Sequence, residues 1–190
     1  MNKAVFLDRD GTINVDKKYL YNIQDFEFLP GVLEALRQLQ QAGYLLVIVT
    51  NQSGIGRGYY TEEDFLRLND WMIKTLKGNG VSICDVYYCP HLPDAKLEKY
   101  HKDCECRKPK LGMYRQAVID HIIDLSVSYA VGDKLRDCSI CKSTACRGFL
   151  IGDNEEKKII EDVKNGLIRN VSYAPDLLSF SKLITKRTVI

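Results

Sequence analysis

The stretch that decides the fold is Ala4-Val-Phe-Leu-Asp8-Arg-Asp10-Gly-Thr12, near the start of the 190-residue chain. Ala4 to Leu7 form a short apolar run, which predicts a buried strand that ends at Asp8. Two carboxylates directly after a buried strand need a partner, and the usual partner is a metal ion. The glycine that follows them allows a sharp turn, so both carboxylates can face one cleft. The stretch therefore predicts a metal site at the end of the first strand.

The rest of the chain alternates short apolar runs with amphipathic segments, which predicts an α/β fold with a parallel sheet. Further strands are expected at 44–49, 82–88, 128–131 and 148–151, and near 171. Helices are expected after 30–31, after an N-cap at Thr61, at 112–123, 137–143 and 155–164, and after Pro175. Residues 89–109 interrupt this rhythm with prolines and charges, and we expect an ordered loop there.

Three of the predicted strands end in polar residues: Asp8 and Asp10, Thr50 and Asn51, and Asp133. Ligands bind at the carboxyl ends of the strands in an open α/β sheet, so these side chains are expected to converge. For one strand alone, capping of the next helix would explain them equally well. Three such ends together favour a site for phosphoryl transfer, with one carboxylate as nucleophile, another as acid and base, and Mg²⁺ as the cation.

A second cluster lies in the predicted loop: Cys89, His91, Cys104 and Cys106. Three thiols and one imidazole are a suitable ligand set for tetrahedral zinc. The alternative is four unrelated reduced residues, but cysteines are seldom gathered in a polar loop. Since four ligands fill the coordination sphere, the zinc is expected to be structural. The loop leads directly into Arg107 and Lys108, so zinc would position this basic pair.

The composition is that of an ordinary globular protein, with 45% hydrophobic and 27% charged residues. A net charge of +2 argues against a nucleic-acid partner, and no apolar run is long enough for a membrane span. We find no signal peptide, so we expect a cytoplasmic protein, in which the seven cysteines act as metal ligands or packed thiols. We also expect a monomer with a small-molecule substrate.

Four motifs resemble those of the haloacid-dehalogenase (HAD) superfamily of phosphatases. They are Phe-Leu-Asp-Arg-Asp-Gly-Thr at 6–12, Val-Thr-Asn-Gln-Ser-Gly at 49–54, Cys-Arg-Lys-Pro at 106–109, and Val-Gly-Asp-Lys-Leu-Arg-Asp at 131–137. The resemblance implies a Rossmannoid parallel sheet with helices on both faces and an aspartyl-phosphate mechanism. Catalytic roles fall on Asp8 as nucleophile, Asp10 as general acid and base, and Thr50 and Lys108 as phosphate ligands. Magnesium is assigned to Asp8, Asp10 and Asp133, with Lys134 beside it and Asp137 in an outer role.

The short spans between the motifs leave little room for a cap domain, which indicates a capless subgroup with a zinc-bound loop. This subgroup contains the D-glycero-D-manno-heptose-1,7-bisphosphate 7-phosphatase family and the histidinol-phosphate phosphatase domain. Segments 12–16, 50–58 and 87–91 favour the heptose family, which implies removal of the 7-phosphate in nucleotide-heptose biosynthesis. The substrate-binding residues that the resemblance implies are Asp16, Tyr19, Thr50, Asn51, Gln52, Ser53, Arg107 and Lys108.

Two alternatives remain open at this point: a histidinol-phosphate phosphatase, and a zinc-stabilised binding module with an inactive phosphatase site. The resemblance implies a single HAD-like phosphatase domain over residues 1–190, with a zinc-binding loop at about 89–109.

Overall fold

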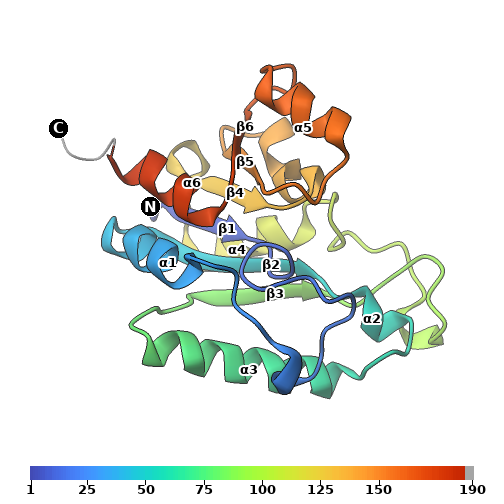
Figure 1. Ribbon diagram of the computed structural model, residues 1–190. Coiled ribbons are helices and arrows are strands. Elements are labelled where there is room, and N and C mark those ends of the chain that lie inside the picture. The colour runs from blue at the N-terminus through green and yellow to red at the C-terminus, as the bar shows by residue number, and fades with distance from the viewer. Residues whose placement is uncertain (187–190) are drawn as a thin grey trace.

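The computed structural model describes residues 1–186, and its centre is a six-stranded sheet with the order β3-β2-β1-β4-β5-β6 (Figure 1). All neighbouring strands are parallel, with Phe6 in register with both Val47 and Ala130. The strands are β1 (Ala4–Leu7), β2 (Leu45–Asn51), β3 (Asp85–Cys89), β4 (Tyr129–Gly132), β5 (Arg147–Ile151) and β6 (Val171–Ala174). The predicted α/β fold is confirmed.

Both faces of the sheet are covered, because successive side chains of a strand point to opposite sides. Val5 and Leu7 face a core that includes residues of α1 (Val32–Gln41), α3 (Glu62–Gly78) and α6 (Leu177–Thr185). Ala4 and Phe6 face the opposite core, with α4 (Gly112–His121), the 3-10 helix η4 (Leu135–Lys142) and α5 (Lys157–Lys164). In Figure 1, α1 and α6 lie side by side over the near face.

The start of α3 shows how the sequence specifies a local element. Thr61 accepts a hydrogen bond from the backbone N–H of Asp64, and the Asp64 carboxylate accepts one from the backbone N–H of Thr61. This reciprocal capping box pairs two backbone donors that the first turn of a helix leaves free. The predicted N-cap is confirmed.

Two elements differ from the sequence-based prediction. The segment predicted as a helix over 137–143 is η4, which starts earlier, because the Asp137 carboxylate accepts the backbone N–H of Lys134. The strand predicted from residue 82 begins at Asp85, because the backbone N–H of Ser82 bonds to the Gln40 side chain and not to β2. Four short helices were not predicted: η1 (Ile23–Asp25), α2 (Ser53–Gly56), η2 (Glu98–Tyr100) and η3 (Leu125–Val127).

The carboxyl ends of the strands meet on the right of Figure 1, where α2 and the long loop after β3 also lie. The chain start lies on the opposite side. Within residues 1–186 no large cap domain is inserted between the strands, as predicted. In the same range, no helix is both long and apolar enough to cross a membrane.

Candidate active site

A cavity of about 330 Å³ lies at the carboxyl ends of β1, β2 and β4. It is lined by residues from four separate segments, all of which the sheet topology brings to one edge. The lining residues are Asp8, Asp10, Asp16, Lys18, Tyr19, Leu20, Thr50, Asn51, Gln52, Ser53, Gly54, Tyr60, Lys108, Asp133, Lys134 and Arg136. The residues predicted for catalysis, magnesium and substrate all belong to this set, except Arg107 and the outer residue Asp137.

Asp8 and Lys108 form the centre of the site. The Lys108 Nζ donates to Asp8 Oδ1 at 2.8 Å and to the Val49 carbonyl oxygen at 2.6 Å, and both charged side chains are buried. Burial raises the pKa of Asp8 to about 7, although Lys108 opposes the shift. Burial lowers the pKa of Lys108, but the carboxylates of Asp137 and Asp8 outweigh it and raise this pKa, so the lysine stays charged. A charged lysine beside a carboxylate can bind the oxygens of a phosphoryl group.

Two further carboxylates complete an acidic cluster with Asp8. Asp137 Oδ1 lies 2.7 Å from Lys108 Nζ, and Asp133 Oδ2 accepts a hydrogen bond from Asn154 at 3.2 Å. Burial, and after it the charge of Asp137, raises the pKa of Asp133 to about 6. Gly11 permits this close approach, because a Cβ there would lie 2.4 Å from Asp133 Oδ2 and its φ is +81°.

The donor set of this cluster fits a hard divalent cation. One oxygen each of Asp8, Asp133 and Asp137 lies within 4.8 Å of the others, and all three residues are buried. One lysine cannot neutralise three buried carboxylates, and carboxylate oxygens are the ligands that Mg²⁺ prefers. Asp137 was predicted only in an outer role, whereas its carboxylate lies inside this cluster.

Asp10, also predicted as a magnesium ligand, directs its carboxylate elsewhere. Oδ1 accepts from Asn14 at 3.0 Å, and Oδ2 accepts from Gln52 at 3.0 Å and from Arg9 at 2.9 Å. The Asp10 pKa is lowered: burial would raise it, but the charge of Arg9 and the hydrogen bonds outweigh burial. Asp10 still lines the cavity beside Asp8, where a proton donor and acceptor for the reaction is needed.

The end of β2 connects the cavity to the lysine segment. The Asn51 side chain accepts from the backbone N–H of Lys108 at 3.0 Å and donates to the Lys108 carbonyl at 3.1 Å. Gln52 donates to the hydroxyl of Thr50 at 2.9 Å. These contacts join the end of β2 to the segment that carries Lys108, although Asn51 and Lys108 are 57 positions apart in the sequence.

The remaining predicted substrate residues divide into two groups. Asp16, Tyr19 and Ser53 line the cavity, and so does Lys134, which was predicted beside the magnesium. Arg107 does not, and its guanidinium donates instead to the His91 carbonyl at 3.4 Å.

The structure also adds cavity residues that the sequence reading missed. They are Lys18, Leu20, Gly54, Tyr60 and Arg136, and the buried Arg9 contacts Asp10 and Leu20 of this lining. For Arg9, the available signal was its position: a charged residue at a buried strand end needs a partner.

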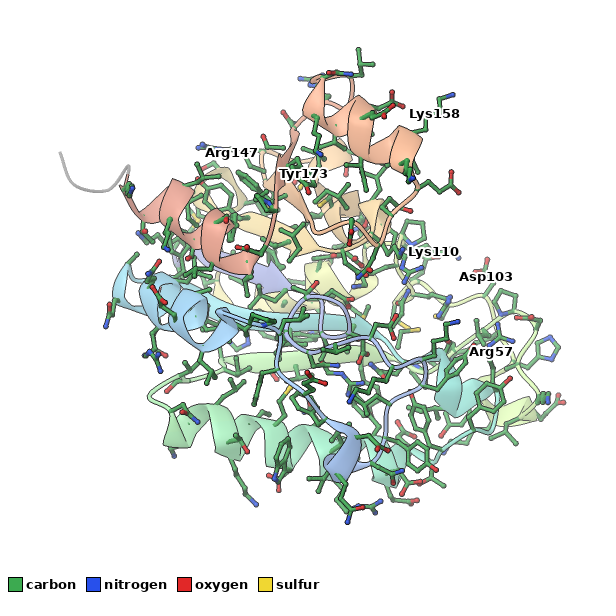
Figure 2. All side chains as sticks on the ribbon, in the orientation of Figure 1. Arg57, Asp103, Lys110, Arg147, Lys158 and Tyr173 are labelled. Carbon is green, nitrogen blue, oxygen red and sulfur yellow. The ribbon has the colours of Figure 1, made fainter. Side chains whose placement is uncertain are left out.

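The predicted zinc residues lie together in the loop after β3. The Cys89, Cys104 and Cys106 sulfurs are 3.0–3.4 Å apart, and His91 Nδ1 is 3.7 Å from Cys89 Sγ and 3.4 Å from Cys106 Sγ. A tetrahedral zinc with Zn–S bonds of about 2.3 Å would place its sulfurs about 3.8 Å apart, so a small expansion would admit the ion. The loop also holds the pair Lys110–Asp103 at 2.7 Å, labelled in Figure 2.

A parallel sheet with an aspartate pair, a threonine, a lysine and an acidic cluster at its carboxyl edge defines the class of HAD phosphatases. Comparisons with known proteins agree. The family model described as polynucleotide kinase 3 phosphatase matches residues 3–163. The D-glycero-beta-D-manno-heptose-1,7-bisphosphate 7-phosphatase of Pasteurella multocida is 45% identical over 94% of this chain and 97% of its own length. The enzyme of the same name from Haemophilus ducreyi is 48% identical over 90% of this chain and 97% of its own length.

A solved structure gives the same result. The D,D-heptose 1,7-bisphosphate phosphatase of B. bronchiseptica, complexed with magnesium and phosphate, superposes with a TM-score of 0.82 at 30% identity, over 98% of this chain and 99% of that one. The chain is a phosphatase of the HAD superfamily and belongs to the D-glycero-D-manno-heptose-1,7-bisphosphate 7-phosphatase family.

Proposed function

We propose that this protein removes the 7-phosphate of D-glycero-D-manno-heptose 1,7-bisphosphate in nucleotide-heptose biosynthesis, through an aspartyl-phosphate on Asp8. The observation that supports it most is the convergence of Asp8, Lys108, Thr50 and Asp133 on one cavity. The names of the relatives supply the substrate class.

The proposed reaction has two steps. Asp8 Oδ attacks phosphorus, and the bond to the sugar oxygen breaks as that oxygen takes a proton from Asp10. A water then attacks the aspartyl-phosphate, its proton passes to Asp10, and Asp8 leaves with the bonding electron pair. Lys108 and Thr50 hold the phosphoryl oxygens in both steps.

Two metals belong to the proposal. Mg²⁺ held by Asp8 and Asp133, with the Asp10 segment and Lys134 beside it, would neutralise charge on the phosphoryl group. Zinc held by Cys89, His91, Cys104 and Cys106 would be structural. Because Lys108 follows Cys106 by only two residues, a loop fixed by zinc would also fix the position of Lys108.

Substrate recognition is assigned to three segments. Asp16 and Tyr19 would contact the sugar, Thr50 to Ser53 would bind around the scissile phosphate, and Arg107 would favour a substrate with a second anionic group. We further propose that the protein acts as a cytoplasmic monomer with one domain over residues 1–190, without a nucleic-acid or membrane partner.

The test is phosphate release from a panel containing heptose 1,7-bisphosphate, the two heptose monophosphates and histidinol phosphate, with ³¹P NMR to locate the cleaved position. The bisphosphate should have the highest kcat/KM, with loss of the 7-phosphate. The Asp8→Asn variant, purified in parallel, controls for contaminating phosphatases. If histidinol phosphate is the best substrate, the heptose assignment is wrong while the phosphatase chemistry stands.

A further inference from the structure

Within residues 1–186, Arg9 is among the largest side chains that are almost fully buried, with 1% of its surface exposed. It lies between Asp8 and Asp10, and none of the roles proposed above includes it. Burying a guanidinium costs free energy, and a well-packed apolar residue at such a position is often at least as stabilising. A buried arginine beside a reaction centre therefore calls for an explanation other than packing.

The Arg9 guanidinium grips the carboxylate of Asp10. Its Nε donates to Oδ2 at 3.2 Å, and its Nη2 lies 3.0 Å from Oδ1 and 2.9 Å from Oδ2. Two nitrogens of one planar group thus engage both oxygens of the carboxylate. This fork geometry fixes the orientation of the carboxylate as well as its distance, which an ammonium group could not do.

Gln52 is a second anchor of the same carboxylate. Its amide nitrogen donates to Asp10 Oδ2 at 3.0 Å and to the Thr50 hydroxyl at 2.9 Å. Its amide oxygen accepts from the Tyr60 hydroxyl at 2.7 Å and from Arg9 at 3.4 Å. Every strong hydrogen-bonding position of Gln52 is thus used inside the protein, and the side chain is buried.

The arginine is itself held in place. Its Nη2 lies 3.5 Å from the Leu20 carbonyl oxygen, and its guanidinium carbon lies 5.4 Å from the centre of the Phe65 ring. Since Leu20 also lines the cavity, the support for Asp10 is continuous with the cavity wall.

We propose that Arg9 is a positioning residue that holds Asp10 for proton transfer, with Gln52 as its second anchor and Tyr60 as the support of Gln52. The inference rests on the proton-transfer role of Asp10 in the proposed function. In the step that hydrolyses the aspartyl-phosphate, the water oxygen bonds to phosphorus, its proton passes to Asp10, and the bond from phosphorus to Asp8 breaks. Asp10 can accept that proton only from a fixed position beside Asp8.

The test uses p-nitrophenyl phosphate, because its leaving group departs without protonation. Asp8 can then attack normally, and only hydrolysis of the aspartyl-phosphate depends on Asp10. Rapid mixing of Arg9→Met with this substrate should give a burst of nearly one p-nitrophenol per chain. Steady turnover should then be slower than in the wild type, on the order of 10²-fold. Asp10→Asn should behave in the same way, and Arg67→Met, at an exposed arginine of α3, should match the wild type.

Tyr60→Phe keeps the test valid if Arg9→Met does not fold, because it removes one hydroxyl and keeps the ring. It should show the same burst with a smaller, few-fold loss of turnover, and Arg9→Lys should fall between Arg9→Met and the wild type.

Three results would overturn the inference. A burst amplitude that falls together with the rate would mean that Arg9 only supports the fold. Unchanged turnover in both Arg9→Met and Tyr60→Phe would mean that Asp10 does not depend on this anchor. If Asp10→Asn itself turns over normally, the proton-transfer role of the proposed function fails, and the inference fails with it.

Discussion

The acidic cluster and the cysteine cluster each gather their ligand atoms within 4.8 Å, but the protein builds them in opposite ways. Asp8 follows β1, whereas Asp133 and Asp137 follow β4 much later in the sequence, and the sheet brings the ends of these two strands together. The four zinc candidates come from one loop, between Cys89 and Cys106. The acidic cluster therefore depends on the assembly of the sheet, whereas the cysteine cluster depends only on the conformation of one loop.

The two clusters also differ in how the protein supports them. The acidic cluster has protein partners: Lys108 contacts two of its carboxylates, and Asn154 contacts the third. The sulfurs of Cys89, Cys104 and Cys106 lie mainly against one another and against His91. We therefore expect the acidic site to keep its shape without a metal and the loop to depend on zinc. Lys108 connects the two clusters, since it follows Cys106 by two residues and its Nζ donates to Asp8 Oδ1.

The largest effect is expected from the acidic cluster. Asp8→Asn should lower kcat by at least about 10³-fold, because an amide cannot attack phosphorus. The fold should persist, since the sheet and not the charge positions residue 8, so circular dichroism should be unchanged. Asp70→Asn, at an exposed residue of α3, is the matched control. Near-native turnover by Asp8→Asn would show that another residue is the nucleophile.

The cysteine cluster should respond in a different way. The purified protein should contain close to one zinc per chain, and Cys104→Ser should lose it and lower Tm by at least about 5 °C. Phosphate handling through Lys108 should weaken, seen as a higher KM. Cys84→Ser, at an exposed cysteine outside the cluster, should keep both zinc and Tm. A zinc-free native protein from metal-replete expression would contradict this prediction.

The sequence predicted all four residues of the cysteine cluster and two of the three carboxylates of the acidic cluster, Asp8 and Asp133, for two physical reasons. Strand-end side chains of a parallel sheet must converge, so Asp8, Thr50 and Asp133 could be placed together from periodicity alone. The cysteine cluster could be predicted from the spacing of its residues in one loop, without knowledge of the fold.

Contacts set by tertiary structure were out of reach. Nothing in the local pattern shows that Arg9 turns inward to Asp10, that Asp137 reaches Lys108, or that Arg107 stays outside the cavity. Cys84 lies in the segment predicted as a strand over 82–88, but it precedes β3 and is exposed.

The stability of the acidic site should depend on pH in a defined direction. Burial raises the pKa of Asp8 to about 7 and that of Asp133 to about 6, so the folded state binds more protons than the unfolded chain between pH 4 and 7. Without Mg²⁺, stability should therefore fall as pH rises through this range, by on the order of a few kcal/mol. The Asp8→Asn side chain has no carboxyl proton to lose. The Tm of this variant minus the Tm of the wild type should therefore increase as the pH rises.

Added Mg²⁺ should reduce this increase in the Tm difference, because the cation stabilises the charged carboxylates of the wild type. A Tm difference between Asp8→Asn and the wild type that is constant from pH 4 to 8 would contradict the raised pKa of Asp8.

The smallest effect separates the two regions as sources of substrate specificity. Arg107 belongs to the cysteine loop and lies outside the cavity lining, whereas Arg136 belongs to η4 beside the acidic cluster and lines the cavity. If the loop reads the second phosphate, Arg107→Ala should raise KM for the bisphosphate several-fold more than for a monophosphate, since arginine binds phosphate through a bidentate fork. Arg136→Ala should then raise both KM values about equally, by a general loss of positive charge. Steady-state kinetics of both variants on the same two substrates would show which of the two arginines sets the preference for the bisphosphate. The reverse pattern, with the bisphosphate preference lost only in Arg136→Ala, would move specificity from the zinc loop to the edge of the sheet.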